Sequence, residues 1–124
     1  MTAKTVLKPP ILQVDLWFKQ GADTSVLFTV TDDDGNPIPD STGYIIEAKI
    51  KDRPNGAVLF TFTGMTITYV SSPVPKSTLT LTADSSQTAE FVFESGVWDC
   101  FVTNPVGKRA CVAEGAVTVD PSVT

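Results

Sequence analysis

Apolar and polar residues alternate in short runs along most of this chain, and glycine, proline, asparagine and aspartate separate the runs. A period of two is typical of β-strands that bury one face, whereas an amphipathic helix repeats about every 3.6 residues. No stretch follows the helical period for more than about two turns. The pattern therefore predicts a domain built almost wholly of β-strands.

The alternation divides the chain into strands and gives several of them a buried face. The expected strands cover residues 11–21, 25–32, 43–52, 58–64, 66–70, 78–83, 97–103 and 108–114, with a last run from 115 that ends at Pro121. The residues expected to face inward in the first and third runs are Leu12, Val14, Leu16, Phe18, Tyr44, Ile46, Ala48 and Ile50.

One segment is a candidate helix, because Asp84 can cap it and residues 85–90 supply one or two turns. We therefore expect an all-β fold: a single β-sandwich, immunoglobulin-like (Ig-like), with about seven to nine antiparallel strands and one short helix before the last hairpin. Pro9 and Pro10 cannot donate to a ladder, so residues 1–11 are expected to form an extended N-terminal arm and residues 12–124 the sandwich domain.

The closing hairpin holds both cysteines of the chain. A four-residue loop over 104–107 would place Cys100 opposite Cys111 and Trp98 opposite Ala113, all on one face. Reduced core thiols are the expected state, because thiols stay reduced in a cytoplasm, and a disulfide between Cys100 and Cys111 is the alternative. A zinc site needs about four ligands, which two cysteines without histidine do not supply.

Two groups of acidic residues are candidates for chemistry outside the core. Asp99 and Glu114 lie diagonally on the other face of the predicted hairpin, and paired carboxylates can serve a glycosidase. We expect them to be solvated, because so short a chain does not build a sugar cleft. In the stretch DDDGN, glycine falls at the fourth position of a calcium loop instead of the sixth, and the twelfth position is Gly43 instead of an acid. A hairpin turn is expected there, with a calcium site between loops as the alternative.

Composition and charge exclude several classes of function. The chain has 124 residues, of which 42% are hydrophobic and 19% charged, and this suits one folded domain. The net charge is −5 and lysine and arginine form no cluster, so we expect no nucleic-acid partner. The chain has no histidine, the commonest general base and metal ligand, so we expect no enzyme activity, no cofactor and no metal.

The sequence gives no sign of membrane insertion. Its N-terminus has no apolar region of the length that a signal peptide needs. No run approaches the ~18 apolar residues of a membrane-spanning helix. We therefore expect synthesis in a cytoplasm and no membrane partner.

Exposed positions supply the candidates for binding. Eight aromatic residues could include a sugar-stacking platform, although most have the spacing of a core: Trp17, Phe18, Phe60, Phe62, Tyr69, Phe91, Phe93 and Trp98. Contacts with other proteins are expected at loop tips and chain ends. The candidate interaction residues are Lys4, Lys8, Asp32, Asp33, Asp34 and Lys76. The N-terminal arm is expected either to fray or to pair with the sheet edge of a neighbouring subunit.

Four stretches together resemble a known family of proteins. They are VDLWFKQGADTSVLFTVTDDDGNPIPDSTGY, IEAKIKD, LTLTADSSQTAEF and GVWDCFVTNPVGKRACVAEGAVTVDPSVT. In this order and spacing they are similar to the small β-sandwich virion proteins of long-tailed bacteriophages, the family that includes tail-collar and long-tail-fibre-attachment proteins. The resemblance covers residues 12–124. The chain departs from the family at Lys19, where arginine is common, and in its cysteine pair.

The resemblance implies a role in a virion. It points to a non-enzymatic structural protein of the phage tail, at the collar, the baseplate or the fibre attachment, which forms a homo-oligomeric ring and contacts other tail proteins. The family has no catalytic motif to carry over. The alternatives are a head decoration or head–tail connector protein of the same particle, and a carbohydrate-binding adhesion module.

Overall fold

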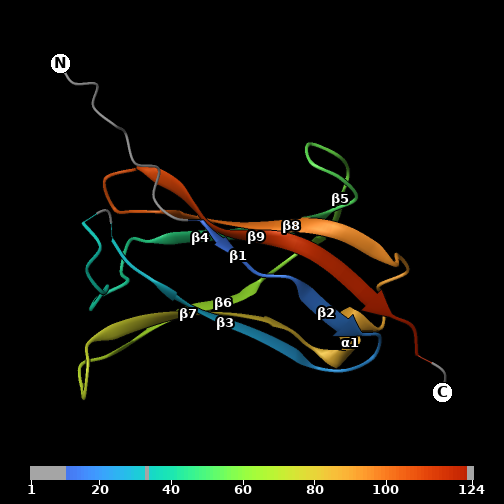
Figure 1. Ribbon diagram of the computed structural model, residues 1–124, viewed down its shortest axis with the longest axis horizontal. Helices are drawn as coiled ribbons and strands as arrows, with labels where there is room; N and C mark the ends of the chain where they lie inside the picture. The colour runs from blue at the N-terminus through green and yellow to red at the C-terminus, as the bar shows by residue number, and fades with distance from the viewer. Residues whose placement is uncertain (1–10, 33, 123–124) are drawn as a thin grey trace.

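The computed structural model describes residues 11–32 and 34–122, which form two β-sheets packed face to face (Figure 1). The large sheet has the strand order β1-β9-β8-β4-β5, with β2 also paired to β9. Its strands are β1 (Leu12–Gln13), β2 (Leu16–Lys19), β9 (Arg109–Asp120), β8 (Ser95–Thr103), β4 (Ile45–Lys51) and β5 (Val58–Thr61). The small sheet has the order β3-β7-β6, and its strands are β3 (Thr24–Val30), β7 (Lys76–Ala83) and β6 (Gly64–Val70).

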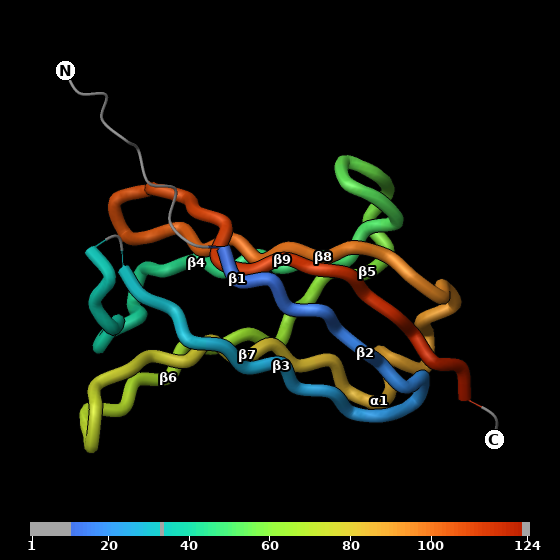
Figure 2. The backbone as a smooth tube through the Cα atoms, viewed as in Figure 1, coloured from blue at the N-terminus to red at the C-terminus, as the bar shows by residue number. Residues whose placement is uncertain are grey.

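The chain crosses between the sheets several times. Figure 2 follows it from β2 into β3 and from β5 into β6, each time from the large sheet to the small one. The expected all-β sandwich is confirmed, and this connectivity is that of an Ig-like fold. The expectation of purely antiparallel strands is wrong at one edge, because β1 and β2 both run parallel to β9.

Alternation along the strands builds the core between the sheets. In β7, Leu79, Leu81 and Ala83 point inward and are fully buried, while the threonines between them point outward. In β4, Ala48 and Ile50 are buried as expected. The core also holds a group of aromatic rings with centroids 4.8 to 6.4 Å apart, in the chain order Phe18, Phe60, Phe62, Phe91 and Phe93.

The expected helix is present as α1 (Ser85–Thr88). The side chain of Asp84 accepts from the amide of Gln87, and the side-chain oxygen of Gln87 accepts from the amide of Asp84, so both halves of a capping box are made. The buried hydroxyl of Thr88 donates to the carbonyl of Ala22 at 2.8 Å and accepts from the amide of Gly21 at 3.1 Å. These bonds fix α1 against the turn between β2 and β3. A membrane-spanning helix is not found among the described residues.

The first strand of the sequence is interrupted at Val14 and Asp15. The indole N–H of Trp98 donates to the carbonyl of Val14 at 2.7 Å, and the amide of Ala116 donates to the carboxylate of Asp15 at 3.1 Å. Gly115 lies opposite Trp98 on β9, and a Cβ there would overlap the carbonyl oxygen of Val14. A glycine is therefore required where this edge segment passes closest to β9.

The register of the closing hairpin differs from the expected one. Thr103 pairs with Arg109, not with Lys108, because the loop has one more residue than expected. The Asn104 side chain accepts from the amides of Val106 and Lys108 at 3.1 and 2.8 Å, which stabilises this longer loop.

A β-bulge then adds a second shift to the hairpin. It lies between Cys100 and Phe101, so that Cys100 pairs with Ala113 and Phe101 pairs with Cys111. The predicted pairing of Cys100 with Cys111 is therefore wrong, and so is that of Trp98 with Ala113.

We expect the Gly115→Ala substitution to lower the free energy of unfolding by about 1–3 kcal/mol, because the added methyl must displace the backbone at Val14. Urea unfolding followed by tryptophan fluorescence measures this. Gly64→Ala is the matched control, because a Cβ there meets only ordinary contacts, the nearest at 3.4 Å. Equal stability losses in the two variants would contradict the close approach at Gly115.

Candidate functional site

The two cysteines are free thiols in environments that keep them protonated. Cys100 is 0% exposed, and burial raises its pKa to about 12, with further increases from the nearby Cys111 and Asp99. Burial also raises the pKa of Cys111, which is half-buried, and the charge of Glu114 adds to it. Because the thiolate is the reactive form of cysteine, neither thiol is prepared to act as a nucleophile or a metal ligand. Within the described residues, no group of three or more histidine, cysteine, aspartate or glutamate side chains could hold a metal ion.

The loop between β3 and β4 contains part of the predicted interaction set. One carboxylate oxygen of Asp32 accepts from the amides of Asp34 and Asn36, both at 2.9 Å, so this side chain stabilises its own turn. Asp34 is exposed at the tip of the turn. Lys4, Lys8 and Asp33 lie outside the residues that the structure describes.

A groove of about 400 Å³ lies on the outer face of the large sheet, the face directed away from the small sheet. Its floor consists of the small or partly buried residues Val97, Gly115 and Ala116. The interrupted edge strand at Asp15 forms one wall. Asn55, in the loop between β4 and β5, lies at the opposite wall, and Figure 1 shows this loop standing above the sheet. We call this feature the outer groove; its lining residues are Gln13, Asp15, Lys49, Lys51, Pro54, Asn55, Val97, Trp98, Asp99, Glu114, Gly115 and Ala116.

Charged side chains of both signs cross the outer groove in register. Glu114 lies directly opposite Asp99, and Asp99 lies directly opposite Lys49 on the next strand. The expected diagonal placement of Asp99 and Glu114 is therefore wrong, because the two residues are direct cross-strand partners. Gln13 pairs with Glu114 on the other side and donates to its carboxylate at 3.0 Å. The expectation that so short a chain builds no cleft around these two acids is also wrong, because both line the outer groove. Since Lys49 faces the two acids, this is a mixed polar site and not a pair of isolated carboxylates.

The outer face of the small sheet has a very different composition. Its central row places Leu27, Thr80 and Thr66 side by side across the three strands. Among the described residues of these strands that point outward, only Lys76, at one end of the face, carries a charge. We call this feature the threonine face; its residues are Ser25, Leu27, Thr29, Gly64, Thr66, Thr68, Val70, Lys76, Thr78, Thr80 and Thr82.

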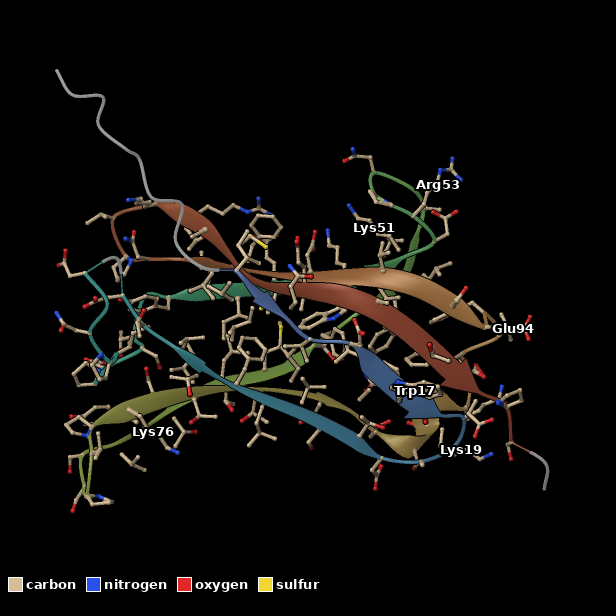
Figure 3. All side chains as sticks on the ribbon, viewed as in Figure 1. Trp17, Lys19, Lys51, Arg53, Lys76 and Glu94 are labelled. Carbon is tan, nitrogen blue, oxygen red and sulfur yellow. The ribbon has the colours of Figure 1, made fainter. Side chains whose placement is uncertain are left out.

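Trp17 is the exception among the large aromatic side chains. The expectation that aromatic residues form the core is confirmed for Phe18, Phe62, Phe91 and Trp98, which are buried. Trp17 is 69% exposed on the outward side of β2, at the front edge of the sandwich in Figure 3. The sequence carried the signal for this, because alternation that buries Leu16 and Phe18 turns the residue between them outward.

Comparisons with known proteins leave the function open. No family model matches this sequence, and no curated protein matches it. One solved structure, from photo-crosslinking analyses of multimeric cell-adhesive interactions of VGSC beta subunits, is similar with a TM-score of 0.41 and 11% sequence identity. The alignment covers 96% of this chain and 100% of that chain. Such a similarity carries no argument about what this chain does.

We expect the two cysteines to differ in reactivity in the folded protein. At about pH 8, iodoacetamide should modify Cys111 slowly and leave Cys100 unmodified until the protein is unfolded, because Cys100 is buried and its thiol stays protonated. Peptide mass spectrometry before and after denaturation measures both rates. Equal labelling in the folded state, or an intact mass lower by two hydrogens, would contradict the buried free thiol.

Proposed function

We propose that this chain is a non-enzymatic structural protein of a bacteriophage virion, located in the tail at the collar, the baseplate or the fibre attachment. The ordered motifs over residues 12–124 support the virion role through their resemblance to tail-collar and fibre-attachment proteins. The threonine face supports a mode of action through contacts between subunits. A head decoration or head–tail connector protein is the second candidate, because the same fold and contacts suit either place.

The threonine face is the observation that carries this proposal. Each copy of the chain has a net charge of −5, and the like net charge of two copies disfavours their association. The threonine face brings almost no charge to a contact, and depletion of charge is typical of the core of protein interfaces. Its β-branched threonines have restricted rotamers, so ordering them at an interface costs little conformational entropy.

The edges of the small sheet offer a second route to assembly. In the strand order of the described residues, β3 and β6 are the outer strands of this sheet. Outer strands present unpaired backbone groups to which another chain can add a strand. A contact of one surface with a different surface on the next copy closes into a ring when the rotation between copies permits it. We therefore include assembly into a homo-oligomeric ring in the proposal.

We expect the Thr80→Lys substitution to weaken self-association at least about tenfold, because a charge at the centre of the threonine face must lose its hydration when the contact forms. Sedimentation velocity over a concentration series measures the association constant, and circular dichroism confirms the fold. Ser95→Lys adds the same charge at an exposed position on the other sheet and is the matched control. A chain that is monomeric at every concentration, or two variants that weaken association equally, would remove the threonine face as a self-contact.

The place of the chain in a particle has its own test. We expect peptides such as GYIIEAK, residues 43–49, in mass spectra of purified phage tails and not of heads. Peptides found only in heads would replace the tail assignment with the decoration or connector role. Absence from both fractions would overturn the structural role.

A further inference from the structure

We propose that the outer groove, together with the exposed Trp17 beside it, is a binding site for a neutral oligosaccharide. The site lies on the large sheet and uses none of the residues of the threonine face. It therefore goes beyond the proposed structural role, and neither location in the particle alters it.

Two local features shape the groove, a small residue on its floor and a tight turn at its wall. The floor is low at Ala116, which lies opposite Val97 on the outward side of the sheet and has a small side chain. The loop between β4 and β5 forms a wall because Asn55 adopts a φ of 60°, which the Asn-Gly sequence accommodates in a tight turn. The groove volume of about 400 Å³ lies within the range of roughly 300–1,000 Å³ that is typical of small-molecule sites.

The outer groove contains both acidic and basic side chains, and this mixture favours an uncharged ligand. The groove is lined by the carboxylates of Asp15, Asp99 and Glu114 and by the ammonium groups of Lys49 and Lys51. An anionic ligand would meet three carboxylates, and a cationic ligand would meet two ammonium groups. A neutral polyhydroxylated ligand satisfies both, because its hydroxyl groups donate to carboxylates and accept from ammonium groups in charge-assisted hydrogen bonds.

The floor of the groove argues against an extended peptide as the occupant. It is the face of a sheet, and at Val97 and Ala116 the backbone belongs to the ladder between β8 and β9. A peptide strand gains its affinity from main-chain hydrogen bonds at a sheet edge, which this surface does not offer. The groups available for hydrogen bonds in the groove are side chains, among them Lys49 and Lys51, which form no ion pair within the described residues.

Trp17 supplies the apolar surface that a sugar ring requires. It follows Asp15, which lines the groove, by two residues, and the edge segment keeps the same register on β9 before and after its interruption. One face of a pyranose ring consists of C–H groups, which pack on the face of an indole, while its hydroxyl groups point outward to polar partners. An oligosaccharide with one ring on Trp17 and the next in the groove uses both parts of the site.

The test is a titration of the intact chain with maltotriose, cellotriose, chitotriose and a neutral galactose trisaccharide. We expect at least one to bind with a Kd on the order of 1 mM or lower and to shift the fluorescence of the exposed Trp17. No heat and no shift with any of the four at about 10 mM would overturn the proposal. Binding only to charged trisaccharides, such as sialylated ones, would overturn the assignment to a neutral ligand.

Variants distinguish the proposed site from non-specific binding. Their affinities are measured by isothermal titration calorimetry, because the Trp17→Ala variant lacks the fluorescent side chain that reports binding. We expect Trp17→Ala and Asp99→Asn each to weaken binding at least about tenfold while circular dichroism and thermal unfolding stay as in the wild type. Val106→Ala is the matched control, since Val106 is 88% exposed at a loop tip outside the groove lining. Binding that both site variants leave unchanged would overturn the proposal.

Discussion

One hydrogen bond joins the interior of this protein to the edge of its large sheet. The indole of Trp98 is buried and packs against Phe28 of the small sheet with ring centroids 6.2 Å apart. A buried N–H without a partner would cost about 1–3 kcal/mol, and the carbonyl of Val14 supplies that partner at 2.7 Å. The bond forms only because Gly115, opposite Trp98, has no side chain to occupy the space. Core packing and the interruption of the edge strand beside the outer groove therefore depend on the same three residues, Val14, Trp98 and Gly115.

Because side chains alternate along each strand, the inner faces of the two sheets form the core and the outer faces are free to differ in composition. Inward positions of β7 are filled by Leu79 and Leu81, so packing dictates their chemistry. Outward positions carry no such constraint, and the two sheets use them differently. The large sheet presents charges, including the ion pairs of Lys19 with Asp120 and of Arg109 with Glu47 at 3.3 and 3.2 Å. The small sheet presents threonines, and among its described outward positions only Lys76 carries a charge.

Local patterns in the sequence were enough to predict the fold but not the site. The period of two located the strands, and the side chain of Asp84 located the helix, because both depend on neighbours within a few residues. The hairpin register depends in part on the Asn104 side chain, which accepts hydrogen bonds from two loop amides and stabilises a loop one residue longer than expected. It also depends on a β-bulge that no local sequence pattern indicates. The outer groove joins segments near residues 15, 50, 55, 98 and 115, which only the completed sheet brings together.

The two proposed surfaces are compatible because they lie on opposite sides of the sandwich. Figure 3 places Lys76 on the layer of the small sheet, while Lys51 and Arg53 stand above the large sheet. A contact that covers the threonine face leaves the outer groove open to solvent, since no residue belongs to both surfaces. Repetition of the subunit in a ring would then present many copies of a weak sugar site in a fixed arrangement. Affinities on the order of 1 mM per site become effective when several sites engage one surface together, so weak binding by a single chain does not argue against the proposed sugar site.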